Sequence, residues 1–287
     1  MKLSDAWRAT KQWTPFAART ALFGSLSLTL GPLTRDHRAS QWAMRKWCQS
    51  SAKALFIDVE VSGLENVPKT GSWVYSSNHQ SILDVLVLGS VLPGDYKWAA
   101  KRSLMKIPFL GWHLRLAGHV PVDRGLGTRA AADVIGRFEK VLREGKPLLV
   151  FPEGTRSDDG FLRSFKNGGF YAAVRAGVPV LPVALEGTYD LMKKGQRDLE
   201  EGKMRRISVR IGKPLLAVTE GKERARVPEL RERTHASVAE MLLSLGGRVI
   251  DPKLAAEEER EEALREKRRK KGGSQGARGG EESSTAG

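Results

Sequence analysis

The sequence predicts an α/β fold with a largely parallel or mixed central sheet, helices on both faces of that sheet, and an N-terminal attachment of amphipathic helices. Three observations predict this fold. Strand-like and helix-like segments alternate from about residue 63 onward, which is typical of a largely parallel sheet covered by helices. Residues 148–151 are all apolar, as expected for a short strand buried on both faces. Polar motifs at residues 78–84 and 151–157 follow apolar runs, where a strand ends and a loop begins.

Each element is predicted from apolar periodicity and from the residues that stop it. The predicted helices end before a glycine or a Pro-Gly pair, and they cover residues 82–92, 128–144, 167–176 and 227–245. The predicted strands cover residues 72–77, 96–100, 119–122, 148–151, 180–185 and 206–211. These elements together form one α/β domain, which we expect over residues 61–250. Residues 251–287 are charged and then Gly/Ser-rich, which predicts a disordered tail.

Residues 1–60 are expected to form amphipathic helices, with an interruption at Pro15. This segment holds four of the seven tryptophans of the chain, and its basic, Trp-containing helices suit a membrane interface. Residues 16–33 are interrupted by polar residues, glycines and a proline, so we expect them to lie in the interface, with spanning as the alternative. A second alternative is that the helices simply pack on the α/β domain. We expect association with the cytoplasmic face of a membrane, as a monotopic or peripheral protein.

The composition indicates a basic protein with no disulfide. The net charge is +15 and the isoelectric point is near 10.1, which predicts attraction to polyanions such as an anionic membrane surface, an acidic carrier or a nucleic acid. Residues 251–287 carry equal numbers of basic and acidic side chains, so the excess charge lies in the rest of the chain. Only residues 267–271 form a basic tract, and the acidic residues within 257–262 largely cancel its charge. No recognition-helix signature indicates nucleic-acid binding, and we expect none. Cys48 is the only cysteine, which excludes an intrachain disulfide and a Cys-rich metal site.

The first polar motif contains His79 and Asp84, which are five positions apart. On one regular helix their side chains would point about 140° apart, so they meet only if His79 lies in the loop before a helix that begins near Asp84. A carboxylate that accepts from one imidazole nitrogen fixes the tautomer, and the other nitrogen can then accept a proton. The pair is therefore a candidate general base and its orienting group. The alternative is a histidine and an aspartate that only cap a helix.

The second polar motif contains Glu153, Gly154 and Arg156. Arg156 can hold a phosphate through paired hydrogen bonds. Gly154 lets main-chain N–H groups approach a ligand closely, and Glu153 is placed to orient the arginine or a substrate hydroxyl. The alternative is an ordinary polar turn. Together the two motifs predict chemistry on a phosphorylated substrate that carries a hydroxyl.

Four sequence blocks resemble those of the glycerophospholipid acyltransferases, specifically the 1-acylglycerol-3-phosphate acyltransferases. Asn78-His79 followed by Asp84 matches the family's signature of a histidine and, after four residues, an aspartate. The other three blocks match in the family's order at residues 101–124, 151–157 and 178–184. The resemblance covers residues 73 to about 187. It also implies that residues 1–60 form a helical pair that lodges in one membrane leaflet.

The resemblance implies a role for each motif residue. His79 is the general base and Asp84 orients it. The remaining residues hold the acceptor's phosphate or shape the acceptor site, and they are Lys101, Arg124, Glu153, Gly154, Thr155 and Arg156. The implied reaction moves a fatty acyl group from acyl-coenzyme A or acyl-carrier protein to the sn-2 hydroxyl of 1-acylglycerol-3-phosphate (lysophosphatidate), giving phosphatidate in phospholipid biosynthesis. No cofactor and no metal are expected, because a thioester is already activated and main-chain N–H groups can hold the oxyanion.

Several alternatives stay open at the level of the sequence. The acceptor could be another lysophospholipid or a related lipid, and the donor could be either thioester. An apolar channel should select the acyl chain, with residues 107–112 and Leu114 as candidates for its wall, although residues 107–112 fit core or membrane-facing surface equally well. Outside this class, the charge permits a basic nucleic-acid-binding protein, and a non-catalytic lipid-surface scaffold is the third alternative.

Overall fold

A computed structural model describes residues 3–34, 38–123, 128–196, 199, 205–218 and 220–249, with side chains described from Trp13 onward. Their main sheet has seven strands in the order β1-β8-β7-β2-β5-β3-β4. Only the β7–β8 pair is antiparallel among these neighbours, so the sheet is mixed but largely parallel, as predicted. The strands are β1 (Ile57–Ser62), β2 (Val74–Ser77), β3 (Lys97–Lys101), β4 (Val120–Val122), β5 (Leu148–Val150), β7 (Val180–Glu186) and β8 (Arg205–Ile211).

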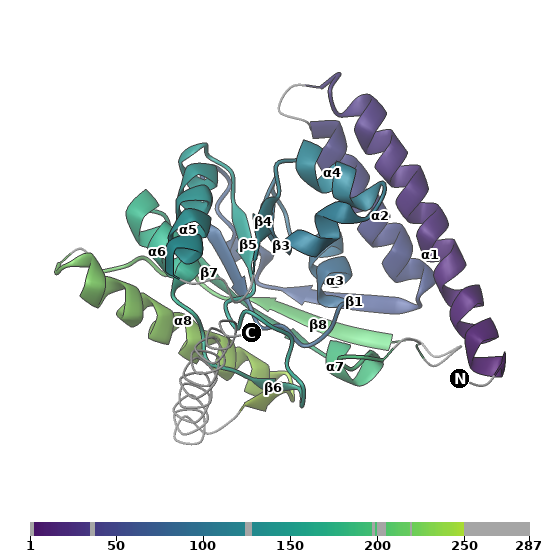
Figure 1. The fold of residues 1–287 in the computed structure, drawn as a ribbon. Coiled ribbons are helices and arrows are strands. Elements are labelled where there is room, and N and C mark those ends of the chain that lie inside the picture. Colours follow the sequence, from purple (N-terminus) through teal and green to yellow (C-terminus); the bar gives the residue numbers. More distant parts are fainter. Residues whose placement is uncertain are drawn as a thin grey trace, which may run out of the picture. The chain divides into compact units, whose positions relative to one another are not determined.

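Helices cover both faces of this sheet, which confirms the predicted fold class (Figure 1). One face carries a hydrophobic cluster with side chains from α2 (Arg38–Ala54) and α3 (Asp84–Val91), and α1 (Leu3–Leu30) packs along α2. The other face carries a second cluster with side chains from α5 (Thr128–Arg143), α6 (Gly168–Ala176) and α8 (Glu223–Ser244). Every strand and helix predicted between residues 72 and 245 lies in the structure within a few residues of its predicted bounds.

Several elements were not predicted from the sequence. Most of them have too few residues to show a periodic pattern. They are the helices α4 (Leu110–Leu116) and α7 (Thr188–Leu191), the 3-10 helices η2 (Leu64–Asn66) and η3 (Arg102–Lys106), and the small parallel sheet of β6 (Phe161–Leu162) and β9 (Arg248–Val249). The edge strand β1 also went unpredicted, because acidic residues alternate with its apolar residues and only one side of the strand is paired. The expected domain boundary after residue 60 falls inside β1, which pairs with β8 and belongs to the sheet.

The N-terminal helices share the core of the sheet domain. On α2, Trp47 and Cys48 are buried, and a Cβ added at Gly89 of α3 would lie 2.3 Å from the Cys48 sulfur. Glycine at position 89 therefore permits the close approach of the two helices. This contact agrees with the alternative in which the helical segment packs on the α/β domain.

Helix α1 continues through Pro15, where the sequence predicts an interruption. A proline inside a helix removes one main-chain hydrogen bond, so the helix needs compensation from tertiary packing. Aromatic contacts beside Pro15 supply such packing: the Phe16 ring lies 5.4 Å from that of Trp13 and 5.5 Å from that of Trp47 on α2. The Trp47 indole N–H also donates to Thr20 Oγ1 at 3.1 Å. Among the helices described, none is both long enough and apolar enough to cross a bilayer.

Candidate active site

The polar motifs meet at one edge of the main sheet because three neighbouring parallel strands end there. Strand β5 lies between β2 and β3 and is parallel to both. The loop after β2 carries His79, the loop after β5 carries residues 153–156, and β3 ends at Lys101. Neighbouring strands are about 4.8 Å apart, so the β5 loop emerges between the histidine loop and Lys101. The carboxyl edge of a parallel sheet is where α/β proteins commonly place their ligands.

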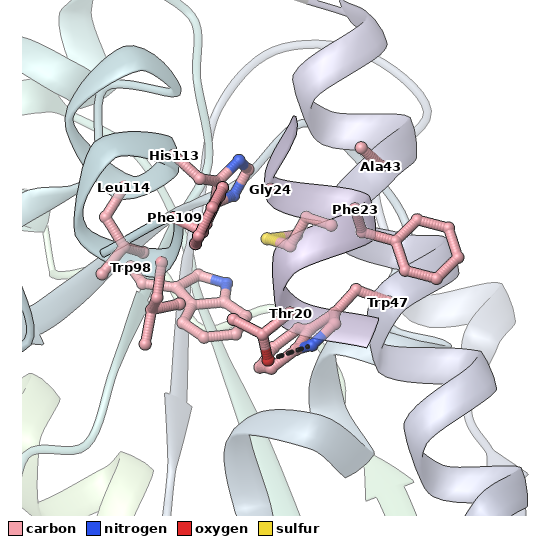
Figure 2. A pocket seen from close by; sticks show the side chains of 11 residues that line it. Thr20, Phe23, Gly24, Ala43, Trp47, Trp98, Phe109, His113 and Leu114 are labelled. Atoms are coloured by element: carbon pink, nitrogen blue, oxygen red, sulfur yellow. Dashed lines mark hydrogen bonds between the residues drawn. The ribbon is translucent and has the colours of Figure 1, made fainter. Parts of the chain in front are cut away.

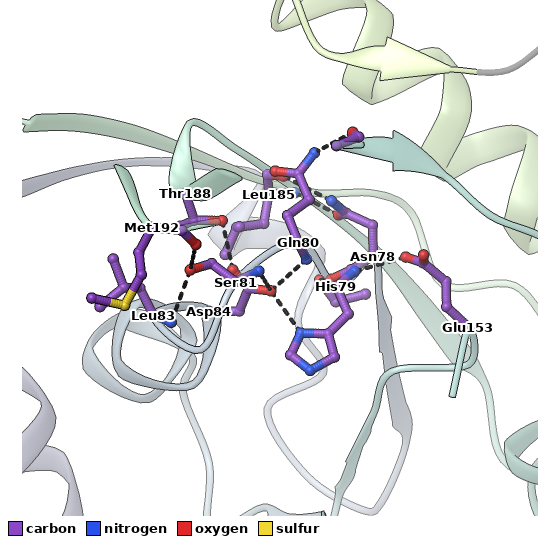
Figure 3. Close-up of polar contacts among 12 residues, drawn as sticks. Asn78, His79, Gln80, Ser81, Leu83, Asp84, Glu153, Leu185, Thr188 and Met192 are labelled. Carbon is purple, nitrogen blue, oxygen red and sulfur yellow. Dashed lines mark hydrogen bonds and ion pairs between the residues drawn. The ribbon is translucent and has the colours of Figure 1, made fainter. Parts of the chain in front are cut away.

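His79 and Asp84 are in direct contact. His79 lies in the loop after β2, and Asp84 is the first residue of α3. The Nδ1 atom of His79 lies 2.7 Å from Asp84 Oδ2, so the imidazole donates from Nδ1 to the carboxylate (Figure 3). The other ring nitrogen, Nε2, points away from Asp84 and has no hydrogen-bond partner in the described part of the chain. This tautomer leaves the Nε2 lone pair available to accept a proton.

Asp84 is fully buried and its charge is held by four hydrogen bonds. Besides the imidazole, Oδ2 accepts from the main-chain N–H groups of Gln80 at 2.7 Å and Ser81 at 3.0 Å. Oδ1 accepts from the Thr188 hydroxyl at 2.6 Å. Such a set of donors stabilises a buried carboxylate and fixes its position. Sequence reasoning missed Thr188, and its only signal is its place directly after the strand of the fourth sequence block.

The two polar loops are bonded to each other on both sides of His79. Glu153 Oε1 accepts from the His79 main-chain N–H at 2.7 Å, and the Ser157 N–H donates to the His79 carbonyl at 2.8 Å. The Phe151 ring stacks on the imidazole, with centroids 4.0 Å apart and planes inclined by 17°. The loop after β5 therefore fixes the position of the His79 main chain and the orientation of its ring.

Burial changes the ionisation of Glu153. Its side chain is 4 % exposed, and burial raises the pKa of its carboxyl from 4.5 to about 8, against the lowering effect of its hydrogen bonds. The second carboxyl oxygen, Oε2, is buried without a hydrogen-bond partner among the described residues. Glu153 was expected to orient Arg156 or a substrate hydroxyl, but its observed bond is to the main chain of the histidine loop.

The conformation of its loop gives a further reason for glycine at position 154. The Gly154 N–H donates to the Phe151 carbonyl at 3.0 Å, so this N–H is engaged within the loop. The residue has φ of +76°, in the left-handed region that favours glycine. A Cβ added here would lie 3.1 to 3.2 Å from the last three atoms of the Lys166 side chain. The backbone conformation therefore favours glycine here, and the lysine side chain that crosses it lies in the space a side chain would occupy.

The cationic residues of the site lie around the same edge. Arg156 and Thr155 are half-buried on the loop after β5, and Lys101 is exposed at the end of β3. Asp123 pairs with Arg102, and neither Lys101 nor Arg156 forms an ion pair or side-chain hydrogen bond within the described ranges. Within those ranges the guanidinium and the amine therefore have no side-chain partner. Arg124 lies outside the residues that the structure describes.

A small, partly open apolar cavity lies on the α3 side of the sheet (Figure 2). Its wall comes from α1, α2, β3 and α4, and includes Phe23, Trp47, Trp98, Phe109, Leu110 and Leu114. Three of these residues belong to the predicted acyl-chain wall, namely Phe109, Leu110 and Leu114. Ile107 and Trp112 are exposed instead, so residues 107–112 divide between the cavity wall and the surface.

The comparisons with known proteins agree with this fold. The family model described as Acyltransferase matches residues 58–186, a stretch that runs from β1 to the end of β7 and contains both polar loops. A solved structure, the 1-acyl-sn-glycerophosphate (LPA) acyltransferase PlsC from Thermotoga maritima, superposes with a TM-score of 0.69 at 30% identity, covering 85% of this chain and 97% of that chain. The fold and these matches thus define a protein of the acyltransferase class.

Curated relatives narrow the class. The 1-acyl-sn-glycerol-3-phosphate acyltransferase of Pseudomonas aeruginosa is 30% identical over 85% of this chain and 94% of its own length. The yeast (Saccharomyces cerevisiae) enzyme of the same name is 31% identical over 80% of this chain and 75% of its own length. The chloroplastic enzyme BAT2 of Brassica napus is 40% identical, and the match spans 56% of this chain but only 46% of that protein. The chain belongs to the 1-acyl-sn-glycerol-3-phosphate acyltransferase family.

Proposed function

We propose that this protein transfers a fatty acyl group to the sn-2 hydroxyl of lysophosphatidate and so forms phosphatidate. The observation that carries the proposal is the His79 imidazole, whose Nδ1 is held by Asp84 while Nε2 is left without a partner in the described chain. The loop that carries Arg156 is hydrogen-bonded directly to this histidine loop. A base and a phosphate-binding cation on adjoining loops suit an acceptor whose phosphate and reacting hydroxyl are close in one molecule.

The proposed chemistry is a direct transfer in which His79 is the general base. Nε2 takes the proton of the sn-2 hydroxyl as its oxygen attacks the carbonyl carbon of the donor thioester. A C–O bond forms, the C–S bond breaks, and the departing thiolate takes this proton from the imidazolium and leaves as a thiol, which returns His79 to its neutral state. Asp84 stabilises the imidazolium that forms in between. Arg156, with Lys101, holds the acceptor's phosphate and thereby positions the hydroxyl.

The apolar cavity is the proposed place for an acyl chain. Its lining is almost entirely apolar, which suits a hydrocarbon chain better than a polar ligand. It lies on the same face of the sheet as α3, whose first residue is Asp84. The donor is proposed to be acyl-coenzyme A or acyl-carrier protein.

The membrane is the proposed partner surface, and its cytoplasmic face is the proposed location. Large apolar side chains are exposed on the neighbouring α1–α2 and α4 regions, and these are Leu22, Leu30, Leu33, Trp42, Ile107 and Trp112. Exposed Trp and Leu side chains bind at a bilayer interface, and the net charge of +15 favours anionic lipids. Flotation with anionic liposomes, beside a gel shift with RNA, tests this partner. Binding to RNA and not to liposomes would contradict the membrane proposal.

An acyltransferase assay with purified protein tests the proposed function. It crosses lysophosphatidate, other lysophospholipids and glycerol-3-phosphate with acyl-coenzyme A and acyl-carrier protein. His79→Ala should lower kcat by at least about 10²-fold, because the transition state loses its base. Arg156→Ala should mainly raise the KM for lysophosphatidate, because the phosphate loses paired hydrogen bonds. Near-normal turnover of His79→Ala, or preference for an acceptor without a phosphate, would contradict the proposal.

A further inference from the structure

We propose that Lys166 is a further binding residue of this site and that its amine contacts the phosphate of the acceptor beside Arg156. The inference rests on the proposed function, because it assigns a second cation to the same phosphomonoester. Lys166 lies outside the four sequence blocks, ten positions beyond Arg156. The fold of the chain after Arg156 brings Lys166 back to the loop after β5.

Main-chain contacts fix Lys166 against the loop after β5. The Lys166 N–H donates to the Pro152 carbonyl at 2.8 Å. The preceding residue, Phe165, is buried in the hydrophobic cluster that includes side chains of α6. Its packing also fixes the main chain at this point. The position of the Lys166 backbone relative to Glu153 and Gly154 is therefore determined by bonds and not by an exposed loop.

The lysine side chain lies across Gly154. A Cβ at position 154 would be 3.1 Å from Lys166 Cδ, 3.2 Å from Cε and 3.2 Å from Nζ. The amine itself thus lies over the Glu-Gly-Thr-Arg turn, two residues from Arg156. Since Gly154 has no side chain, the lysine reaches this position without a clash.

The charge of this amine is not neutralised by the acidic residues of its surroundings. In the loop beyond Arg156, Asp158 pairs with Lys194 at 2.7 Å and Asp159 with Arg163 at 3.4 Å. Within the described ranges, Lys166 Nζ itself has neither an ion pair nor a hydrogen bond. The Lys166 amine and the nearby Arg156 guanidinium thus both lack a counter-ion among the described residues. Two such cations side by side are suited to bind a doubly charged phosphomonoester.

Steady-state kinetics of Lys166→Gln test the inference, with Lys69→Gln as the matched control. Lys69 is also an exposed lysine, but it precedes β2 and so lies toward the opposite edge of the sheet. Loss of one charge-assisted contact predicts a rise of about tenfold in the KM for lysophosphatidate, with kcat and the KM for the acyl donor changed by less than about twofold. Lys166→Arg, which keeps the charge, should restore most of the affinity, and Lys69→Gln should behave as the wild type.

The outcomes separate this inference from the proposed function. An active wild type whose Lys166→Gln variant has an unaltered KM for lysophosphatidate would overturn the role of Lys166 alone. A rise only in the KM for the donor would overturn it too, because the phosphate contacted would then belong to the donor. A wild type without transfer to lysophosphatidate would remove the proposed function, and this inference with it. Melting temperatures of the variants show whether a change in KM comes from unfolding. If Lys166→Gln is destabilised, the test is Lys166→Arg: a KM for lysophosphatidate near that of the wild type supports the role of the charge, and a raised KM in a stable Lys166→Arg protein contradicts it.

Discussion

The Glu153 carboxyl oxygen Oε1 accepts a hydrogen bond from the main-chain N–H of His79 at 2.7 Å, although the two residues are 74 positions apart in the chain. This bond joins the loop after β5 to the loop after β2. The bond from the Ser157 N–H to the His79 carbonyl makes a second connection in the opposite direction. The candidate base and the candidate phosphate-binding loop are therefore one hydrogen-bonded unit. A substitution that moves one loop should also change the position of the other.

Replacing Glu153 should affect turnover through the position of His79. Glu153→Ala leaves the His79 N–H without its acceptor, and a buried donor without a partner destabilises its loop by about 1–3 kcal/mol. We expect kcat to fall by on the order of tenfold or more, with a smaller change in the KM for the acceptor. Glu153→Gln keeps a carbonyl oxygen that can accept from this N–H and should retain more activity than Glu153→Ala. Equal kcat values for Glu153→Ala and the wild type would contradict the positioning role.

The raised pKa of Glu153 predicts a specific dependence of stability on pH. The folded carboxyl keeps its proton up to about pH 8, whereas the unfolded chain loses it near pH 4.5. Between these values the folded state binds more protons, so the free energy of unfolding should fall as the pH rises. Melting temperatures measured from pH 5 to pH 8 should decline less steeply for Glu153→Gln, which has no proton to lose there. Parallel curves for the two proteins would show that the folded carboxyl is already ionised at pH 5 and that its pKa is not raised.

Thr188 should act through Asp84. Its hydroxyl donates to Asp84 Oδ1 at 2.6 Å, and Asp84 in turn holds the imidazole. Thr188→Val removes the donor while keeping the shape of the side chain, so we expect kcat to fall by on the order of tenfold at a similar KM for both substrates. Thr188→Ser keeps the hydroxyl and should recover most of the loss. A fall in melting temperature without a change in kcat would assign Thr188 a purely structural role.

The sequence predicts those parts of the site that depend on neighbouring residues. His79 and Asp84 are five positions apart, and the strand before them and the helix after them suffice to predict that they meet. The buried strand 148–151 was likewise readable from four apolar residues. Residues of the second polar motif were predicted as a phosphate-binding turn for the same reason, because Gly154 and Arg156 are only two positions apart in the sequence.

The remaining features depend on strand order and register, which a single sequence does not contain. Thr188 reaches Asp84 only because β7 lies beside β2, and Glu153 reaches His79 only because β5 lies on the other side of β2. The N-terminal segment shows the same limit: β1 was assigned to an attachment, but its pairing with β8 makes it part of the sheet. The continuity of α1 through Pro15 also depends on tertiary contacts, here between Phe16 and the Trp47 side chain of α2.

The apolar cavity makes a prediction about chain length. Leu114 lies in its wall and is 2 % exposed, so a larger side chain at this position projects into the cavity or displaces its neighbours. Leu114→Phe should lower kcat/KM for long acyl chains more than for short ones, because hydrocarbon that no longer fits loses about 0.8 kcal/mol of burial per CH₂. A series of acyl-coenzyme A donors and a series of lysophosphatidates, each varied in length, would show which chain the cavity holds. Leu243→Phe changes an exposed leucine on α8, away from this face of the sheet, and serves as the control. If Leu114→Phe lowers activity equally at every chain length in both series, the cavity is part of the structural core and not a chain-binding site.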